Sequence, residues 1–219
     1  MANLIYFCDV LRIVRRFYLE LTVFLCGMAV MAFEIVGARV LGPYVGASMF
    51  VWSSIIGVIL LSLSIGYVWG GRLADKRPGF HVLGWIILIS CIAMALSTLI
   101  KEPVLHWLTD RIPDVRIAGV SSSLILFSVP AVLLGMVSPF AARLKITSLK
   151  TSGSTVGYLY AISTLGSITG TLLAGFFLIP WFRISNILYT LSVILLVTAL
   201  LLFVVYGKTT SAGSGGRAV

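Results

Sequence analysis

One acidic residue, Glu34, stands inside a long apolar run, between Phe33 and Ile35. Burying a carboxylate in hydrocarbon is costly, so this side chain must face protein or water, and such residues are candidate functional sites. Arg39 follows at a spacing that does not favour an ion pair on one helix, so we expect each residue to find its partner elsewhere. Two interpretations stay open: a structural polar contact that holds this helix in a bundle, or a site that binds a proton or a cation.

Deep in the apolar runs, no second carboxylate or histidine accompanies Glu34. An enzyme would need such a partner or a metal cluster in the same cleft, so we predict no catalytic residue. We predict no metal site, because His81 and His106 are isolated and the three cysteines lack metal-binding spacing. We predict no cofactor, since the C-terminal Gly-Ser-Gly-Gly run lacks the flanking strand and helix of a phosphate loop.

The composition is that of a membrane protein. Of the 219 residues, 59% are hydrophobic and 11% are charged, whereas a soluble protein has roughly 25% charged residues. Because about 20 helical residues cross a hydrocarbon core about 30 Å thick, we predict an all-α integral membrane protein with a bundle of about six transmembrane helices. The expected spans are Phe17–Leu41, Met49–Gly71, Phe80–Ile100, Ile117–Met136 (which could extend past Pro139), Val156–Trp181 and Ile184–Tyr206.

The basic residues set the predicted orientation, because short cytoplasmic loops carry an excess of Lys and Arg. With both termini inside, the cytoplasmic side of the cell inner (plasma) membrane holds Arg12, Arg15, Arg16, Arg72, Lys76, Arg77, Arg143, Lys145, Lys150, Lys208 and Arg217, and the outer side holds Arg39, Lys101, Arg111, Arg116 and Arg183. We therefore expect a cytoplasmic segment at residues 1–16, the transmembrane domain at residues 17–206 and a disordered cytoplasmic tail at residues 207–219.

The net charge of +9 would suggest nucleic-acid binding in a soluble protein. Here the basic residues gather at the ends of apolar runs, where they meet anionic lipid, so the predicted partner is the lipid bilayer and not nucleic acid. The external segment Lys101–Arg116 contains two prolines and Trp107. We expect it to form an interfacial turn or a short amphipathic helix.

The two halves of the chain, with three helices each, would have opposite topology. A similarity joins Trp52–Gly57, Gly66 and Gly70 in the first half to Ile162–Gly166, Gly170 and Gly175 in the second. This pattern suggests a 3+3 inverted repeat, with the shared composition of membrane helices as the alternative explanation. The pairs Gly66/Gly70 and Gly166/Gly170 favour close helix packing, and a gap that admits substrate is the second interpretation.

The string Gly71-Arg72-Leu73-Ala74-Asp75-Lys76-Arg77 falls in the predicted tight loop between the second and third spans. Asp75 can cap the next helix there or pair with a neighbouring arginine. The pattern resembles the signature loop of major facilitator transporters, which implies a gating latch made by Gly71, Arg72, Asp75 and Lys76. The string departs from that pattern at Pro78 and Gly79, and this chain has half the helices of that family.

Longer strings resemble the membrane domain fused to bacterial and archaeal spermidine-synthase-like proteins. These strings are Glu34–Gly46, Val51–Ser54, Gly66–Tyr67, Gly70–Asp75, Leu134–Pro139 and Gly157–Ser167. In that family a soluble aminopropyltransferase domain follows the membrane part, and no position of this chain matches its catalytic aspartates.

The resemblance implies a membrane module that transports or binds a small polar or cationic solute of the polyamine class, or that anchors a soluble aminopropyltransferase-like partner. We take Glu34, Arg39, Trp52 and Ser53 as the candidate substrate-binding residues. A structural subunit of a larger membrane assembly is the first alternative, and a membrane enzyme is the second. Homo-oligomerisation stays open.

Overall fold

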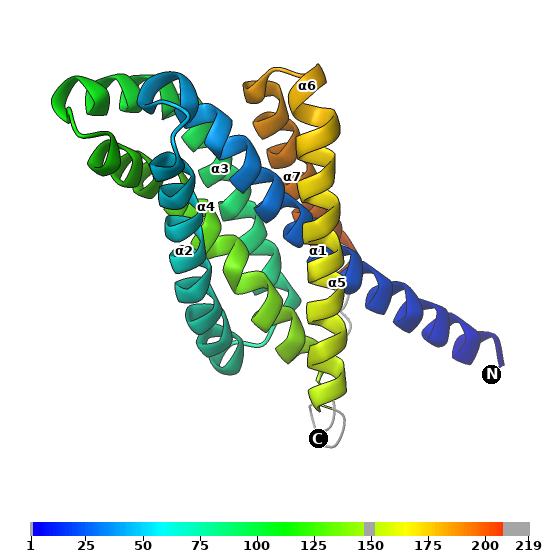
Figure 1. Ribbon diagram of the computed structural model, residues 1–219. Helices are drawn as coiled ribbons and strands as arrows, with labels where there is room; N and C mark the ends of the chain where they lie inside the picture. Colours follow the sequence, from blue (N-terminus) through cyan, green and yellow to red (C-terminus); the bar gives the residue numbers. More distant parts are fainter. Residues whose placement is uncertain (1, 147–151, 208–219) are drawn as a thin grey trace.

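The computed structural model describes residues 2–146 and 152–207, with side chains at residues 17–146 and 152–206. Its elements are α1 (Ala2–Val45), α2 (Met49–Lys76), α3 (Phe80–Arg111), α4 (Val115–Lys145), α5 (Ser152–Leu172), the π-helical η2 (Leu173–Leu178), α6 (Ile179–Trp181) and α7 (Ile184–Gly207) (Figure 1). In the described chain, six helical stretches are long and apolar enough to cross a membrane, which confirms the predicted all-α bundle. Except for Gly207, the predicted disordered tail lies outside the described residues.

Helix α2 extends further than the apolar pattern indicated. Gly71–Lys76 was predicted to lie in a tight loop, but these residues continue the helix, and the connection to α3 is only Arg77–Gly79. The first proline after the start of α2 is Pro78, whose ring disfavours a helical conformation at the preceding residue. The loss of hydropathy at Gly71 therefore marks where the side chains become polar and not where the helix ends.

The segment predicted to be interfacial is mostly a continuation of α3. Helix α3 runs through Pro103 to Arg111, and Figure 1 shows its last part lying across the end of the bundle. Asp114 then caps α4, because its carboxylate accepts a 2.8 Å hydrogen bond from the amide of Arg116. Lys101 ties this region to α7 through a 3.0 Å hydrogen bond to Ser185.

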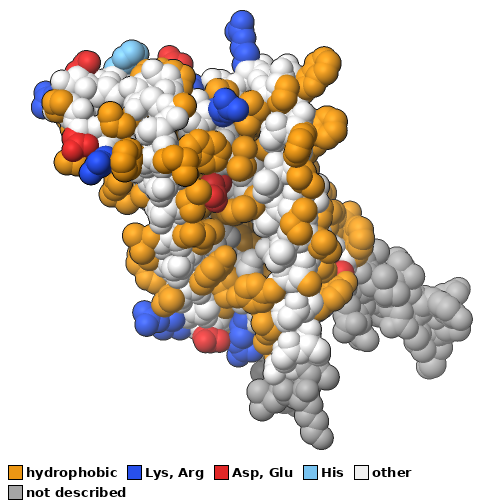
Figure 2. All heavy atoms as spheres, in the orientation of Figure 1, with side chains coloured by type: hydrophobic (Ala, Val, Ile, Leu, Met, Phe, Trp, Pro, Cys, Tyr) orange, Lys and Arg blue, Asp and Glu red, His pale blue; other side chains and the backbone are white. Residues whose placement is uncertain are grey.

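Helices pack mainly as three neighbouring pairs: α2 with α4, α1 with α5, and α3 with α7. Hydrophobic side chains cover most of the middle of the bundle surface, where one acidic group is also visible, and the other charged side chains gather mainly at its two ends (Figure 2). We call the end that carries Arg72 and Arg143 the basic end, and the end that carries Lys101 and His106 the opposite end. This distribution suits a bundle surrounded by lipid.

Pro130 interrupts α4, and a neighbouring helix satisfies the group that it frees. A proline has no amide hydrogen, so the carbonyl of Leu126, four residues earlier, loses its donor within the helix. The hydroxyl of Ser97 on α3 donates to that carbonyl oxygen at 2.7 Å. This proline is therefore accommodated by packing.

Candidate functional site

The backbones of α2 and α4 touch through glycines. A Cβ atom added at Gly66 would overlap the carbonyl oxygen of Val132, and one added at Gly70 would also meet the α4 backbone. Gly135 faces α2 in return, since its added Cβ would lie 3.0 Å from the carbonyl oxygen of Leu63. Only glycine permits so close an approach, so Gly66 and Gly70 serve helix packing, which was the favoured interpretation.

The same kind of contact joins α5 to α1. A Cβ atom added at Gly166 would overlap the carbonyl oxygen of Phe24, and one added at Gly170 would meet the α1 backbone one turn further along. Gly27 faces α5 in return, and its added Cβ would overlap the carbonyl oxygen of Ser163. The second pair is thus as tightly packed as the first.

The two interfaces correspond residue by residue. Three contacts between α2 and α4 recur between α5 and α1. The contact of Leu63 with Gly135 recurs as Ser163 with Gly27, that of Gly66 with Val132 as Gly166 with Phe24, and that of Gly70 with Met136 as Gly170 with Met28. The difference in residue number between α2 and α5 is the same in all three cases, and so is the difference between α4 and α1. An inverted repeat requires this exchange of α1 with α4 and of α2 with α5, so the contacts support the predicted relation between the halves. The predicted register is corrected, because Gly166 corresponds to Gly66 and not to Gly57, whose added Cβ would meet nothing within 4 Å.

A cavity of about 80 Å³ lies where the two helix pairs meet. All four helices line it, through Cys26, Gly27, Val30, Met31, Leu63, Tyr67, Leu134, Gly135, Ser138, Ser163 and Ser167. Most of these positions are exchanged by the repeat: Gly27 with Gly135, Leu63 with Ser163, and Tyr67 with Ser167. The surface in Figure 2 is hollowed between α2 and α5, on the side where this cavity lies.

Three hydroxyl groups in the cavity do not donate to their own helix. The Oγ atoms of Ser138 and Ser163 lie 3.4 Å apart, and Ser167 donates to a carbonyl oxygen of α1 at 3.3 Å. By contrast, Ser64 and Thr164 each donate to the carbonyl four residues earlier, which is the usual arrangement in a membrane helix. The cavity serines therefore present oxygen atoms to the space between the helix pairs.

Sequence reasoning did not single out these serines. Their one available signal is the spacing Ser163-x-x-x-Ser167, which places both hydroxyls beside the packing glycine Gly166 on one helix face. Ser138 gives no comparable signal, because only the fold brings it to α5.

Glu34 lies one turn of α1 from this cavity. It follows Val30 by four residues and Met31 by three, so it shares their face of the helix. Its Oε2 atom is buried, and no described residue donates a hydrogen bond to it. In the described chain the ion pairs join Lys101 to Glu102, Arg143 to Asp75 and Lys145 to Glu20, so Glu34 belongs to none of them.

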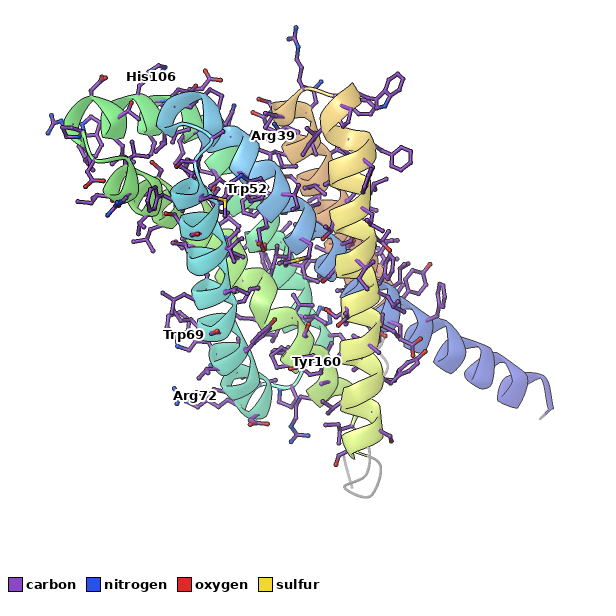
Figure 3. The ribbon with its side chains drawn as sticks, in the orientation of Figure 1. Arg39, Trp52, Trp69, Arg72, His106 and Tyr160 are labelled. Carbon is purple, nitrogen blue, oxygen red and sulfur yellow. The ribbon has the colours of Figure 1, made fainter. Side chains whose placement is uncertain are left out.

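The other candidate binding residues lie apart from the cavity. Arg39 is exposed and points from the part of α1 near His106, at the opposite end of the bundle (Figure 3). Trp52 and Ser53 are also exposed, on the half of α2 nearer that end. None of these three residues lines the cavity next to Glu34.

The residues of the predicted gating latch lie at the basic end. Asp75 pairs with Arg143 on α4, with a distance of 2.8 Å between the carboxylate oxygen and Nε. It does not cap α3, whose N-cap residue is Gly79. Arg72 and Lys76 are exposed (Figure 3 labels Arg72). The ion pair between Asp75 and Arg143 therefore joins α2 to α4 at the surface.

A second cluster at the basic end crosses between the two helix pairs. Lys145 of α4 forms an ion pair with Glu20 of α1, and only 17% and 22% of these side chains are exposed. The Tyr158 hydroxyl of α5 donates to the other oxygen of Glu20 at 3.2 Å, and the Lys145 ammonium lies 4.5 Å from the centre of the Tyr158 ring. The cluster therefore joins α4 to the α1–α5 pair below the cavity.

No group of three or more potential metal ligands forms in the part of the chain that the structure describes. No protein-family model matches the chain, and neither a curated protein nor a solved structure gives a match to it. The length and apolar composition of six helices among the described residues define the class of protein, a multi-pass, all-α integral membrane protein.

Proposed function

We propose that this chain is a membrane module that binds, and moves across the bilayer, a small cationic solute, with Glu34 as the counter-charge. One observation carries the proposal: a buried carboxylate oxygen of Glu34 has no hydrogen-bond donor among the described residues. An ionised group left without a partner in an apolar environment is expensive, and a bound cation would remove that cost.

The size of the neighbouring cavity limits what can enter. Its volume of about 80 Å³ is enough for a few water-sized groups. An ammonium head group fits this space. The resemblance to spermidine-synthase-like membrane domains favours polyamines as the solute class, so we propose that one charged end of such a molecule is bound near Glu34.

We further propose that the basic end faces the cytoplasm, with the protein in the cell inner (plasma) membrane. Arg72 and Lys76 lie near the end of α2, Arg143 and Lys145 lie in the last turn of α4, and the ion pair between Asp75 and Arg143 joins these two helix ends. An excess of basic residues favours retention of a loop on the cytoplasmic side. The solute site would then lie between two ends that differ in charge.

Binding of radiolabelled spermidine and putrescine to the purified protein in nanodiscs tests the proposal. The wild type should bind one of them saturably, and Glu34→Gln should abolish binding because it removes the counter-charge without changing the side-chain volume. Glu102→Gln is the matched control, since its side chain is 65% exposed at the far end of α3. Equal binding by wild type and Glu34→Gln would show that Glu34 does not hold the solute.

The exposed cationic side chains Arg72, Lys76 and Arg77 favour a second candidate function, the anchoring of a soluble aminopropyltransferase-like partner. No binding of either polyamine by the wild type would favour this docking role or that of a structural subunit. Salt-sensitive co-purification of such a partner, lost when these three residues are changed to Gln, would then support docking, because exposed charges act through screened electrostatics.

A further inference from the structure

We propose that the cavity between the helix pairs is a binding site for a monovalent cation of the size of Na⁺, held by the hydroxyl oxygens of Ser138, Ser163 and Ser167. The cavity lies near the middle of α2, at Leu63, and between positions that the repeat exchanges. Ion sites of membrane transport proteins built from inverted repeats occur at the interface between the repeats and near mid-membrane. This is the cavity beside Glu34, whose carboxylate lies one turn away, so Na⁺ and the ammonium group of the proposed solute would compete for it.

The hydroxyl geometry suits a small cation. Ser138 and Ser163 come from different helix pairs, and their Oγ atoms are 3.4 Å apart. Two oxygens at about 2.4 Å from one ion, a distance typical of Ca²⁺ and of the similarly sized Na⁺, have this separation when they subtend a right angle. Ser167 uses its hydrogen for the carbonyl of Gly27, so its oxygen lone pairs stay free to face the cavity.

The backbone carbonyl of Gly135 is the candidate for a further ligand oxygen. Pro139 has no amide hydrogen, so the carbonyl of Gly135, a lining residue, has no donor four residues later in α4. At Pro130 the corresponding carbonyl is taken by Ser97, whereas among the described residues no backbone amide of another helix donates to that of Gly135. Carbonyls freed within broken helices are the groups that coordinate ions in membrane transport proteins.

The charge around the cavity selects a monovalent ion. No lining residue carries a formal charge, and the nearest acidic residue along α1 is Glu34, one turn beyond Val30. A single carboxylate at that distance balances one positive charge, whereas a divalent ion would retain an excess charge in an apolar bundle. The volume of about 80 Å³ leaves room beside the ion for water that completes the coordination.

Binding of ²²Na⁺ to the protein in nanodiscs, with no organic solute present, tests this inference. The wild type should bind ²²Na⁺ saturably, and unlabelled Na⁺ should compete better than K⁺ at constant ionic strength. The double variant Ser138→Ala/Ser163→Ala should bind about tenfold more weakly or not at all, because two ligands are lost. The control Ser128→Ala/Thr164→Val removes hydroxyls from the same two helices that donate to their own backbone, and it should bind as the wild type does.

A second variant keeps the test informative if the alanine pair does not fold. Ser163→Leu places in α5 the residue that α2 carries at the corresponding position, Leu63, which packs against Gly135. The fold should accept it, and it should fill the cavity and abolish ²²Na⁺ binding. Absence of binding by the wild type, or undiminished binding by Ser163→Leu, would overturn the inference. The ²²Na⁺ assay contains no polyamine, so the two proposals can fail separately. Polyamine binding without Na⁺ binding would overturn the Na⁺ site alone, and Na⁺ binding without polyamine binding would overturn only the solute proposal.

Discussion

Gly66 on α2 and Gly166 on α5 make the same contact, each with a backbone carbonyl of the neighbouring helix, yet the side chains beside them differ. Leu63 and Tyr67 flank the first glycine, whereas Ser163 and Ser167 flank the second. Close backbone contact tolerates no side chain, so the glycines are constrained alike in both pairs. The flanking positions are not constrained in this way, so one copy supplies two bulky side chains to the shared cavity and the other supplies two small hydroxyl side chains.

The largest loss of stability is expected at the two packing glycines, Gly66 and Gly166. Gly66→Ala and Gly166→Ala should each lower the free energy of unfolding by about 3 kcal/mol, the upper end of the usual cost of overpacking, because the new methyl group meets backbone and not a flexible side chain. Reversible unfolding of the protein in mixed detergent micelles measures this change.

Gly57→Ala and Gly157→Ala are matched controls for the glycine variants. Both glycines lie on the same two helices, and a Cβ added at either would meet nothing within 4 Å. The controls should be neutral or slightly stabilising, since alanine has the higher helix propensity. A large loss at Gly66 with none at Gly166 would break the correspondence between the two helix pairs.

The second prediction concerns the connection between the pairs. Glu20→Gln should reduce stability by about 1–2 kcal/mol, because it leaves the largely buried ammonium of Lys145 without its charged partner. A double-mutant cycle with Lys145→Met isolates the interaction between the two residues. If their coupling energy is near zero, the ion pair does not hold the two helix pairs together at the basic end.

The six spans could be predicted from the sequence because a hydrocarbon solvent demands long apolar helices. The ends of the helices could not, since Gly71–Lys76 is helical although its side chains are polar. The predicted alignment of the two halves of the repeat was also wrong. Two matching glycine strings can be aligned in several ways, and only the contacts of Gly66 and Gly166 with neighbouring backbones select one alignment.

The candidate site could be predicted only in part. Glu34 stands out in sequence because an acid is rare in an apolar run. Serines do not, because most hydroxyls in membrane helices bond to their own backbone, as those of Ser64 and Thr164 do. Whether a serine instead faces a cavity depends on the helix packed against it, so Ser138 and Ser163 could not be paired before the fold was known.

The smallest expected effect concerns the latch at Asp75. It joins two helices that glycine contacts already hold together, and its side chains are 69% and 48% exposed. Exposed ion pairs contribute about 0.2–1 kcal/mol, so Arg143→Gln should change the free energy of unfolding less than Glu20→Gln does. Raising the salt concentration should remove this difference between wild type and Arg143→Gln, because screening weakens exposed pairs far more than buried ones. A cost as large as that of Glu20→Gln would mean that the pair between Asp75 and Arg143 stabilises the basic end as much as the largely buried pair between Glu20 and Lys145.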